Sequence, residues 1–341
     1  VIMDLINSST HVINVSTSLT NSTGVPTPAP KTIIAASLFM AFIIGVISNG
    51  LYLWMLQFKM QRTVNTLLFF HLILSYFIST LILPFMATSF LQDNHWAFGS
   101  VLCKAFNSTL SVSMFASVFF LSAISVARYY LILHPVWSQQ HRTPHWASRI
   151  ALQIWISATI LSIPYLVFRT THDDHKGRIK CQNNYIVSTD WESKEHQTLG
   201  QWIHAACFVG RFLLGFLLPF LVIIFCYKRV ATKMKEKGLF KSSKPFKVMV
   251  TAVISFFVCW MPYHVHSGLV LTKSQPLPLH LTLGLAVVTI SFNTVVSPVL
   301  YLFTGENFKV FKKSILALFN STFSDISSTE RTQTLNSETE I

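Results

Sequence analysis

The chain has 341 residues, of which 51% are hydrophobic and only 11% are charged, with a formal net charge of +13 and a mean hydropathy of +0.50. Soluble domains carry charge on about 25% of their residues, so this chain lacks the solvated surface of an ordinary cytosolic enzyme. The same scarcity of charged groups excludes a basic nucleic-acid-binding domain, despite the positive sign of the net charge.

The N-terminal segment, residues 1–32, is polar and rich in Ser and Thr. It lacks the charged and apolar regions of a cleavable signal peptide, so the first span is expected to act as the insertion signal. Three N-x-S/T sequons predict glycosylation at Asn7, Asn14 and Asn21, provided that the segment is extracellular.

Seven apolar runs follow, and each is long enough to cross a bilayer, which takes roughly 20 apolar residues. They cover residues 33–58, 64–90, 101–133, 146–168, 200–227, 245–271 and 280–303. A buried soluble helix can be equally apolar, but seven in succession favour the membrane. The sequence therefore predicts an all-α membrane protein, with a bundle of seven transmembrane helices over residues 33–303.

Lys and Arg gather in the loops after the first, third and fifth of these runs and after the seventh. The opposite loops hold fewer cations, balanced by Asp and Glu. Because cytoplasmic loops of membrane proteins are enriched in Lys and Arg, we expect the N-terminus outside the cell. Cys103 and Cys181 are then the two cysteines in the oxidising compartment, which predicts a disulfide between them.

Proline interrupts five of the predicted spans, at Pro84, Pro164, Pro219, Pro262 and Pro298. Proline removes a backbone donor and kinks a helix, so this pattern predicts a bundle with an internal cavity and moving parts. The plainer interpretation is that proline is simply commoner in membrane helices than in soluble ones.

None of the 13 Asp and Glu residues lies within the seven runs. Proton-coupled transporters and intramembrane hydrolases usually need buried carboxylates or paired metal ligands, so we expect no enzyme, metal or cofactor. Arg211 lies well inside the fifth run, where a cation is costly. Either it meets an anionic ligand in an outward-facing crevice, with His204 two turns away on the same helical face, or a carboxylate of the outer loop covers it. The loop candidates are Asp190, Glu192 and Glu195.

Seven short motifs, in the right order on the seven runs, resemble the rhodopsin-like (class A) G-protein-coupled receptors. They are Asn49, Trp96-Ala97-Phe98-Gly99 before Cys103, Arg128-Tyr129, Trp155, Pro219 with Tyr227, Cys259-Trp260-Met261-Pro262, and Ser297-Pro298-Val299-Leu300-Tyr301. Residues 256–264 and the Trp-x-Phe-Gly motif resemble the chemoattractant branch of formyl-peptide, anaphylatoxin and chemerin receptors. This resemblance implies a plasma-membrane receptor whose ligand activates a heterotrimeric G protein, of the inhibitory class.

The resemblance also implies roles for individual residues. Arg128 would contact the G protein when the sixth helix swings outward, with Tyr227 and Tyr301 closing around it. Trp260 would lie below the ligand crevice, and Pro262 would provide the bend for the swing. Without the family, ordinary aromatic packing would explain Trp260 and the tyrosines.

The ligand crevice implied by the resemblance contains Arg211, His204, Ser111, Tyr263 and His264. The formyl-peptide pattern adds an Asp in the third span and a second Arg in the fifth, where this chain has Ser111 and Cys207. We therefore expect an anionic peptide or lipid, carrying a carboxylate, rather than a formyl peptide.

Three departures from the family pattern change the expected behaviour. Ala127 replaces the Asp before Arg128, which implies raised basal activity or weakened coupling. Tyr76 and Ser297 replace polar residues of the family's internal sodium site, so that site should not form. These departures keep a non-signalling or decoy receptor of the same fold as an alternative; a seven-span transporter is disfavoured because no inverted repeat is found.

Two segments follow the last span. Residues 304–319 mix apolar and basic residues, which predicts a short amphipathic eighth helix on anionic lipids of the inner leaflet; a simple stop-transfer cluster is compatible too. Residues 320–341 are expected to be a disordered cytoplasmic tail rich in Ser and Thr. Phosphorylation there would recruit arrestin, and the candidate sites are Ser324, Ser327, Ser328 and Thr329.

Overall fold

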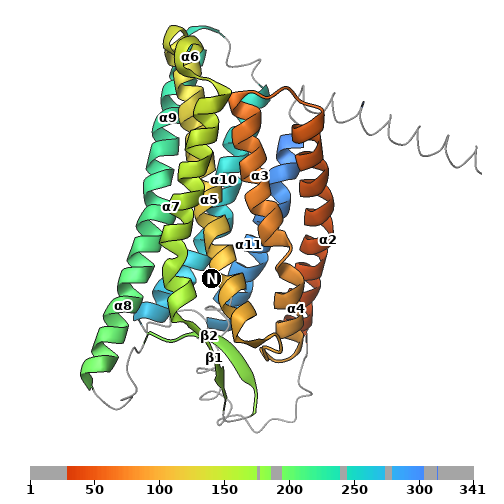
Figure 1. Cartoon of the computed structure of the whole chain (residues 1–341), viewed down its shortest axis with the longest axis vertical. Coiled ribbons are helices and arrows are strands. Elements are labelled where there is room, and N and C mark those ends of the chain that lie inside the picture. Colours follow the sequence, from red (N-terminus) through yellow and green to blue (C-terminus); the bar gives the residue numbers. More distant parts are fainter. Residues whose placement is uncertain are drawn as a thin grey trace, which may run out of the picture.

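The computed structural model describes residues 29–174, 177–185, 194–238, 244–272, 279–302 and 313. The chain forms a bundle of long helices with a small β-hairpin at one end (Figure 1). The sequons at Asn7, Asn14 and Asn21, the proposed helix over 304–319 apart from residue 313, and the tail over 320–341 lie outside the described residues.

The helices follow the apolar runs in chain order. They are α2 (Ala29–Phe58), α3 (Val64–Thr80), α4 (Leu83–Leu91), α5 (Gly99–Leu133), α6 (Pro135–His141), α7 (Pro144–Phe168), α8 (Lys194–Phe212), the π-helix η1 (Leu213–Leu217), α9 (Leu218–Glu236), α10 (Lys244–Thr272) and α11 (Leu279–Leu302). The strands β1 (Arg169–Asp173) and β2 (Ile179–Asn183) pair antiparallel between α7 and α8.

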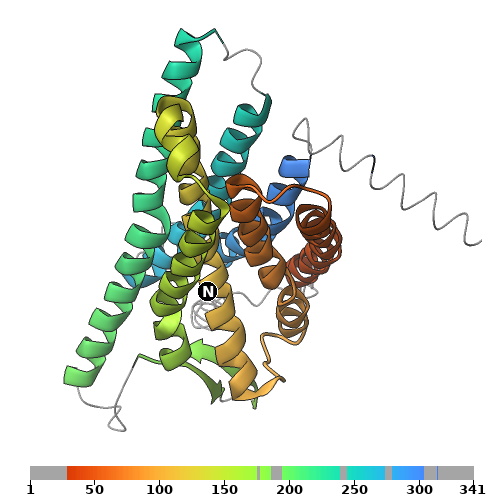
Figure 2. The same cartoon turned by 45° about the horizontal axis from the view of Figure 1, so that its top comes forward.

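Six helical stretches are long and apolar enough to cross a membrane, counting α3 with α4 as one and α8, η1 and α9 as another. The seventh is α11, whose 24 residues reach about 36 Å at 1.5 Å per residue, enough for a bilayer core of about 30 Å. Figure 2 shows α8, η1 and α9 as one continuous rod. The predicted bundle of seven transmembrane helices is thus confirmed.

The helix α5 forms the centre of the bundle. Of its most apolar window 72% is buried inside the protein, against 28% for α7, and it contacts α3, α7 and α9. On α7, the side chains of Ile156, Ile160 and Ile163 are about half exposed on the outer surface, as a lipid-facing helix requires.

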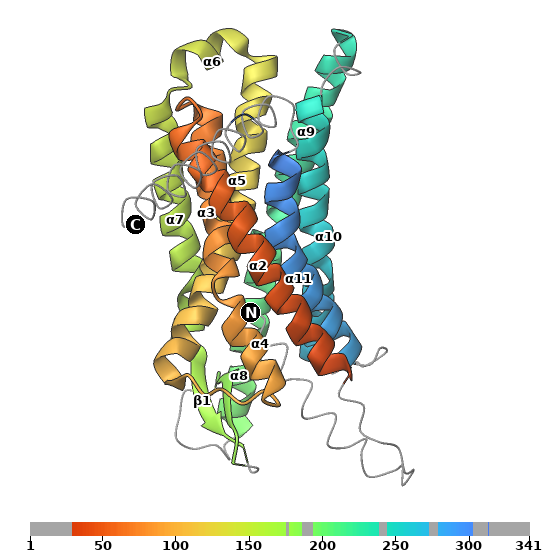
Figure 3. The same ribbon diagram turned by 90° about the vertical axis from the view of Figure 1, so that its right-hand side faces the viewer.

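Two polar contacts join helices that are distant in the sequence. Asn49 of α2 donates its amide to the carbonyl of Gly45, at 2.8 Å, and to that of Thr294 of α11, at 3.1 Å. Figure 3 shows these two helices side by side. Trp155 of α7 donates to Nδ1 of His71 of α3 at 3.3 Å. Family motif residues therefore hold the bundle together through buried hydrogen bonds, which are costly to leave unmade.

The five prolines have different local consequences. Pro84 lies in the first turn of α4, after a break at Leu81 that separates α4 from α3. Pro219 lies in the first turn of α9, directly after the π-helix η1. The other three lie inside continuous helices: Pro164 in α7, Pro262 in α10 and Pro298 in α11. Proline therefore breaks the helix in the second span only, and an irregular turn precedes it in the fifth.

The two ends of the bundle differ as the charge pattern predicts. The hairpin and its disulfide lie at one end, and α6 lies at the other (Figure 1). A disulfide belongs to an oxidising compartment, so the hairpin end is extracellular and the α6 end cytoplasmic. This agrees with an N-terminus outside the cell.

Candidate functional site

The extracellular hairpin is tied to α5 by the predicted disulfide. Cys103 near the start of α5 pairs with Cys181 of β2, with Cα atoms 5.8 Å apart. In the hairpin register, Cys181 faces Thr171 and Arg169 faces Asn183. The expected Cys103–Cys181 pair is confirmed, and it places the hairpin across the outer ends of α5 and α7.

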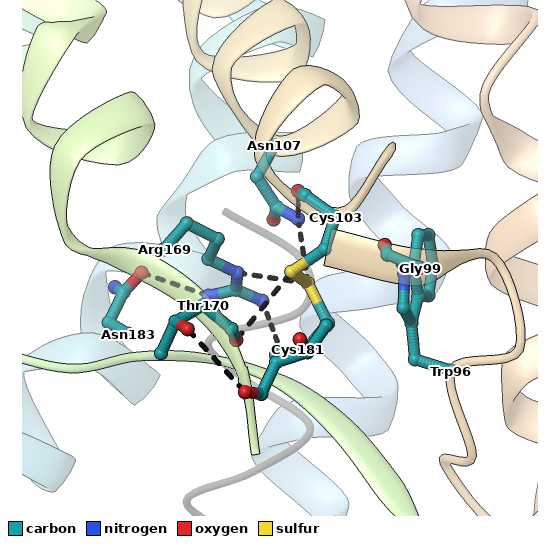
Figure 4. Close-up of a disulfide and its surroundings, with 9 residues drawn as sticks. Trp96, Gly99, Cys103, Asn107, Arg169, Thr170, Cys181 and Asn183 are labelled. Carbon is teal, nitrogen blue, oxygen red and sulfur yellow. Dashed lines mark hydrogen bonds between the residues drawn. A yellow bond between two sulfur atoms is a disulfide. The ribbon is translucent and has the colours of Figure 1, made fainter. Parts of the chain in front are cut away.

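Arg169 is the first residue of β1, and its side chain is fully buried beneath the hairpin (Figure 4). It donates to the carbonyl of Cys181 at 2.8 Å and to Oδ1 of Asn183 at 3.0 Å. Asn107 of α5 donates to the carbonyl of Cys103 at 2.8 Å. Sequence analysis missed Arg169, and its position at the junction of an apolar run and a polar loop gave the only signal.

Arg211 lies in the last turn of α8, and only 8% of its surface is exposed. Its guanidinium carbon lies 4.3 Å from the ring centroid of Tyr165 of α7 and 5.4 Å from that of Tyr263 of α10. Aromatic faces attract cations, most strongly where water is excluded. Arg211 is thus held between α7 and α10, which makes it a bridge between two helices.

Other carboxylates near the outer end have partners of their own. Lys31 hydrogen-bonds to Asp93, which holds the pKa of that carboxyl below its usual range. Lys180 pairs with Asp174 at 2.9 Å. Asp190 and Glu192 lie outside the described residues, as does the side chain of Glu195. The two interpretations of Arg211, ligand counter-ion or loop partner, both remain open.

A chain of aromatic contacts leads from Arg211 toward the centre of the bundle. The ring of Tyr263 lies 5.7 Å from that of Trp260 and 5.2 Å from that of His264. His264, which is 4% exposed, also packs against Phe216 at 4.7 Å. A change at Arg211 can therefore reach Trp260 through a single intervening ring.

The remaining crevice candidates lie differently. His204 stacks on Tyr185 with ring centroids 4.9 Å apart, and the Tyr185 hydroxyl accepts from Asn183 at 2.9 Å. His204 is thus joined to the hairpin. Ser111 is fully buried, and Ser162 of α7 donates to its hydroxyl at 3.0 Å. In this conformation Ser111 links α5 to α7.

The π-helix η1 begins two residues after Arg211 and was not predicted. A Cβ atom at Gly215 would lie 3.1 Å from Phe115 and 3.3 Å from Met114 of α5, so glycine permits the close approach of the two helices. Single π turns are rare and concentrate at functional sites. The π turn changes the register between Arg211 and Pro219, so the side chains on either side do not follow a regular helix.

A small cavity lies below Trp260. The centre of a water molecule can occupy about 20 Å³ of this cavity, which is room for one water. Among the described residues, Ser113 Oγ, Trp260 Nε1 and Asn293 Oδ1 are buried there without a hydrogen-bond partner. The family's sodium site would lie here, but Tyr76 presents a phenol where a carboxylate is needed. These residues do not fit a sodium ion; the side chain of Ser297 lies outside the described residues.

Two arginines lie toward the cytoplasmic end. Arg142, after α6, hydrogen-bonds to Asn65 of α3. Burial lowers the pKa of Arg142, and the positive charge of Arg128 lowers it further. Ala127, the residue directly before Arg128, is buried, with 1% of its surface exposed. The Arg142 contact was not predicted, because it joins residues far apart in the sequence.

Tyr227 and Tyr301 are the two tyrosines expected around Arg128. Tyr227 lies in α9, packs against Phe246 of α10 with ring centroids 5.5 Å apart, and lies within electrostatic reach of Arg128. Tyr301 lies in α11, but its side chain is outside the described residues. Arg128 of α5 and Tyr227 of α9 therefore both lie toward this end of the bundle.

Residues 48–301 match the family described as "7 transmembrane receptor (rhodopsin family)". The chain belongs to this family. It is 90% identical over 339 residues to probable G-protein coupled receptor 33 of Rattus rattus, covering 99% of this chain and 100% of that one. The human protein of the same name is 72% identical, covering 97% and 100%. Human chemerin-like receptor 1 is 40% identical over 284 residues, covering 81% and 75%.

As a rhodopsin-family receptor, the protein is a multi-pass protein of the plasma membrane and not an enzyme. Membership of this family implies a ligand and a G protein as partners in general. The resemblance drawn from seven motifs is thereby confirmed, as is the likeness to chemerin-type receptors.

Proposed function

We propose that this receptor binds an extracellular anionic ligand, a peptide or lipid bearing a carboxylate, with Arg211 as its counter-ion. The observation that carries the proposal is the placement of a buried guanidinium between Tyr165 and Tyr263. A cation at this depth is costly and marks a functional site by default. A carboxylate can form two parallel hydrogen bonds with a guanidinium, which an aromatic face cannot.

Ligand binding then reaches the transducing part of the receptor through the aromatic chain. A carboxylate that draws Arg211 away from Tyr263 leaves that ring free to repack, and Tyr263 contacts Trp260. The bound and unbound arrangements form a two-state equilibrium that the ligand shifts by its differential affinity. The 40% identity to a protein named chemerin-like receptor 1 supports a related ligand.

At the cytoplasmic end we propose that Arg128 contacts a heterotrimeric G protein. The resemblance to chemoattractant receptors supports the inhibitory class. Phosphorylation of the tail would recruit arrestin, and glycosylation of Asn7, Asn14 and Asn21 would cover the extracellular segment. A ligand-binding but non-signalling receptor is the second candidate, because Ala127 cannot restrain Arg128 as a carboxylate would.

The decisive test begins with a screen of acidic peptides and lipids on cells that express the receptor, read out as G-protein activation. For each agonist, Arg211→Ala should raise the half-maximal concentration about tenfold or more, since a hydrogen bond to a charged group is lost. Arg211→Lys should recover part of the potency, because it keeps the charge without the planar fork.

Arg178→Ala is the matched control, because Arg178 is an extracellular arginine that pairs with Asp174 outside the crevice. It should leave potency within about twofold, as exposed ion pairs contribute little. Unchanged potency of every agonist in Arg211→Ala, at equal surface expression, would end the proposal. Agonist binding without G-protein activation would favour the non-signalling receptor instead.

A further inference from the structure

A second cavity, of about 170 Å³, lies at the cytoplasmic ends of α2 and α3, far from the ligand crevice. It is smaller than the roughly 300–1,000 Å³ of drug-sized pockets, which suits a small headgroup. Polar side chains from the loop and both helices line one part of it, and apolar side chains line the rest. The polar ones are Gln57, Arg62 and His71, and the apolar ones include Leu67 and Phe70.

The polar wall is a set of hydrogen-bond donors. Arg62 offers five N–H groups and no acceptor. Trp155 donates to Nδ1 of His71, so the neutral ring carries its proton on Nε2 and has a donor left for the cavity that it lines. Thr66, the third residue of α3, also lines the cavity, near the N-terminal end of that helix, which Thr63 caps.

No carboxylate of α2, α3 or their connecting loop offsets this charge. The sequence has no Asp or Glu between Asp4 and Asp93, so α2, α3 and their connecting loop contain none. Within the described part of the chain, no ion pair includes Arg62. Lys59 of the same loop extends over the ring of Trp54, 5.4 Å from its centroid. The cation that lines this cavity could therefore pair with an anion from outside these elements.

The surroundings identify where the anion comes from. Phe58, the last residue of α2 and the sequence neighbour of Gln57, is 70% exposed, as expected of a side chain in lipid. The cytoplasmic leaflet carries the anionic lipids, and basic pockets between transmembrane helices on that side recognise their headgroups. We propose that the cavity binds the phosphate headgroup of an anionic phospholipid from the inner leaflet, with Arg62 as the main contact.

The proposal is tested on the purified full-length receptor in detergent by native mass spectrometry. The probes are dioctanoyl phosphatidylinositol 4-phosphate and dioctanoyl phosphatidylcholine, which share their chain length. The receptor should bind the first in preference to the second. Arg62→Gln should lower the affinity for the anionic lipid about tenfold, and Arg62→Lys should lower it less.

Two further variants separate a built site from a general charge effect. Leu67→Trp fills the cavity without changing charge and should also abolish the preference. Arg229→Gln removes a cation exposed on the cytoplasmic part of α9 and should change the affinity less than twofold. An equal loss in Arg229→Gln and Arg62→Gln, or no loss in Arg62→Gln, would overturn the proposal.

Inorganic phosphate distinguishes the source of the anion. At 10-fold molar excess over the lipid it should leave lipid binding unchanged, because the apolar wall of Leu67 and Phe70 favours the lipid. Displacement by phosphate would overturn the lipid assignment. Thermal unfolding of each variant checks that a loss of lipid does not reflect misfolding.

Discussion

The two ends of this bundle hold arginines in different ways. At the extracellular end, Arg169 donates to Cys181 and Asn183 beneath a hairpin that a disulfide fixes to α5. At the cytoplasmic end, the positive charge of Arg128 acts on Arg142 as a like charge. Arg169 is part of a hydrogen-bonded frame closed by a disulfide, whereas Arg142 hydrogen-bonds to Asn65 and also experiences the like charge of Arg128.

This difference indicates which end can change conformation. Buried networks with satisfied hydrogen bonds and a covalent link favour a single arrangement. The positive charge of Arg128 lowers the pKa of Arg142, and this unfavourable interaction is relieved when the two groups move apart or when Arg142 meets an anion. We therefore expect the hairpin end to keep its shape during activation, while the α6 end shifts between states.

The largest effect is expected from removing the extracellular frame. Replacing both Cys103 and Cys181 by Ser opens a loop between residues 78 apart in the sequence. Loss of such a disulfide typically costs about 2–5 kcal/mol. We expect a much lower thermal unfolding temperature of the purified receptor and a loss of surface expression. Cys259→Ser changes a cysteine outside the disulfide and should leave both the unfolding temperature and the surface expression nearly unchanged.

An unfolding temperature of the double variant within the error of the unmodified receptor would contradict this account. The hairpin would then be held by hydrogen bonds, those of Arg169 and those that join Ile179 to His95 and Trp96. Arg169→Gln in the double-variant background would show whether those hydrogen bonds suffice, since it leaves the carbonyl of Cys181 without its donor.

A smaller effect is expected at the cytoplasmic end, where Ala127→Asp restores a carboxylate beside Arg128. The new ion pair would stabilise the resting state by about 1 kcal/mol, so basal G-protein activation should fall about fivefold. Ala127→Asn, of similar size but neutral, is the control and should leave basal activity higher than Ala127→Asp. The measurement is nucleotide exchange on the G protein without agonist.

Basal activation that is equal in the two variants would show that Ala127 does not set the resting state. The like charge of Arg142 would then be the stronger influence on Arg128. In that case Arg142→Gln should lower basal activity, because it removes the repulsion that favours the open arrangement.

The sequence predicts the spans and the disulfide well, for physical reasons that need no structure. Apolar runs of bilayer length report burial in lipid directly, and the topology leaves Cys103 and Cys181 as the pair outside the cell. Arg211 was found because a cation in an apolar run is costly. All three signals are local properties of the chain.

Contacts between distant segments could not be predicted in the same way. The rings of Tyr165 and Tyr263 over Arg211, the Ser162–Ser111 hydrogen bond and the interaction of Arg142 with Arg128 each join different helices. The π turn before Pro219 was not predicted either, since nothing in the residues of η1 distinguishes a π-helix from a regular α-helix.

The smallest effect is expected from sodium in the middle of the bundle, between the rigid extracellular end and the mobile cytoplasmic end. Replacing sodium by potassium at constant ionic strength should change agonist affinity less than about twofold. The reason is that the cavity below Trp260 offers the phenol of Tyr76 and no carboxylate. Tyr76→Asp supplies that carboxylate and should make affinity depend on sodium, whereas Tyr76→Asn should not. A clear sodium dependence of the unmodified receptor would refute the argument, since neutral oxygens alone would then suffice to hold the ion.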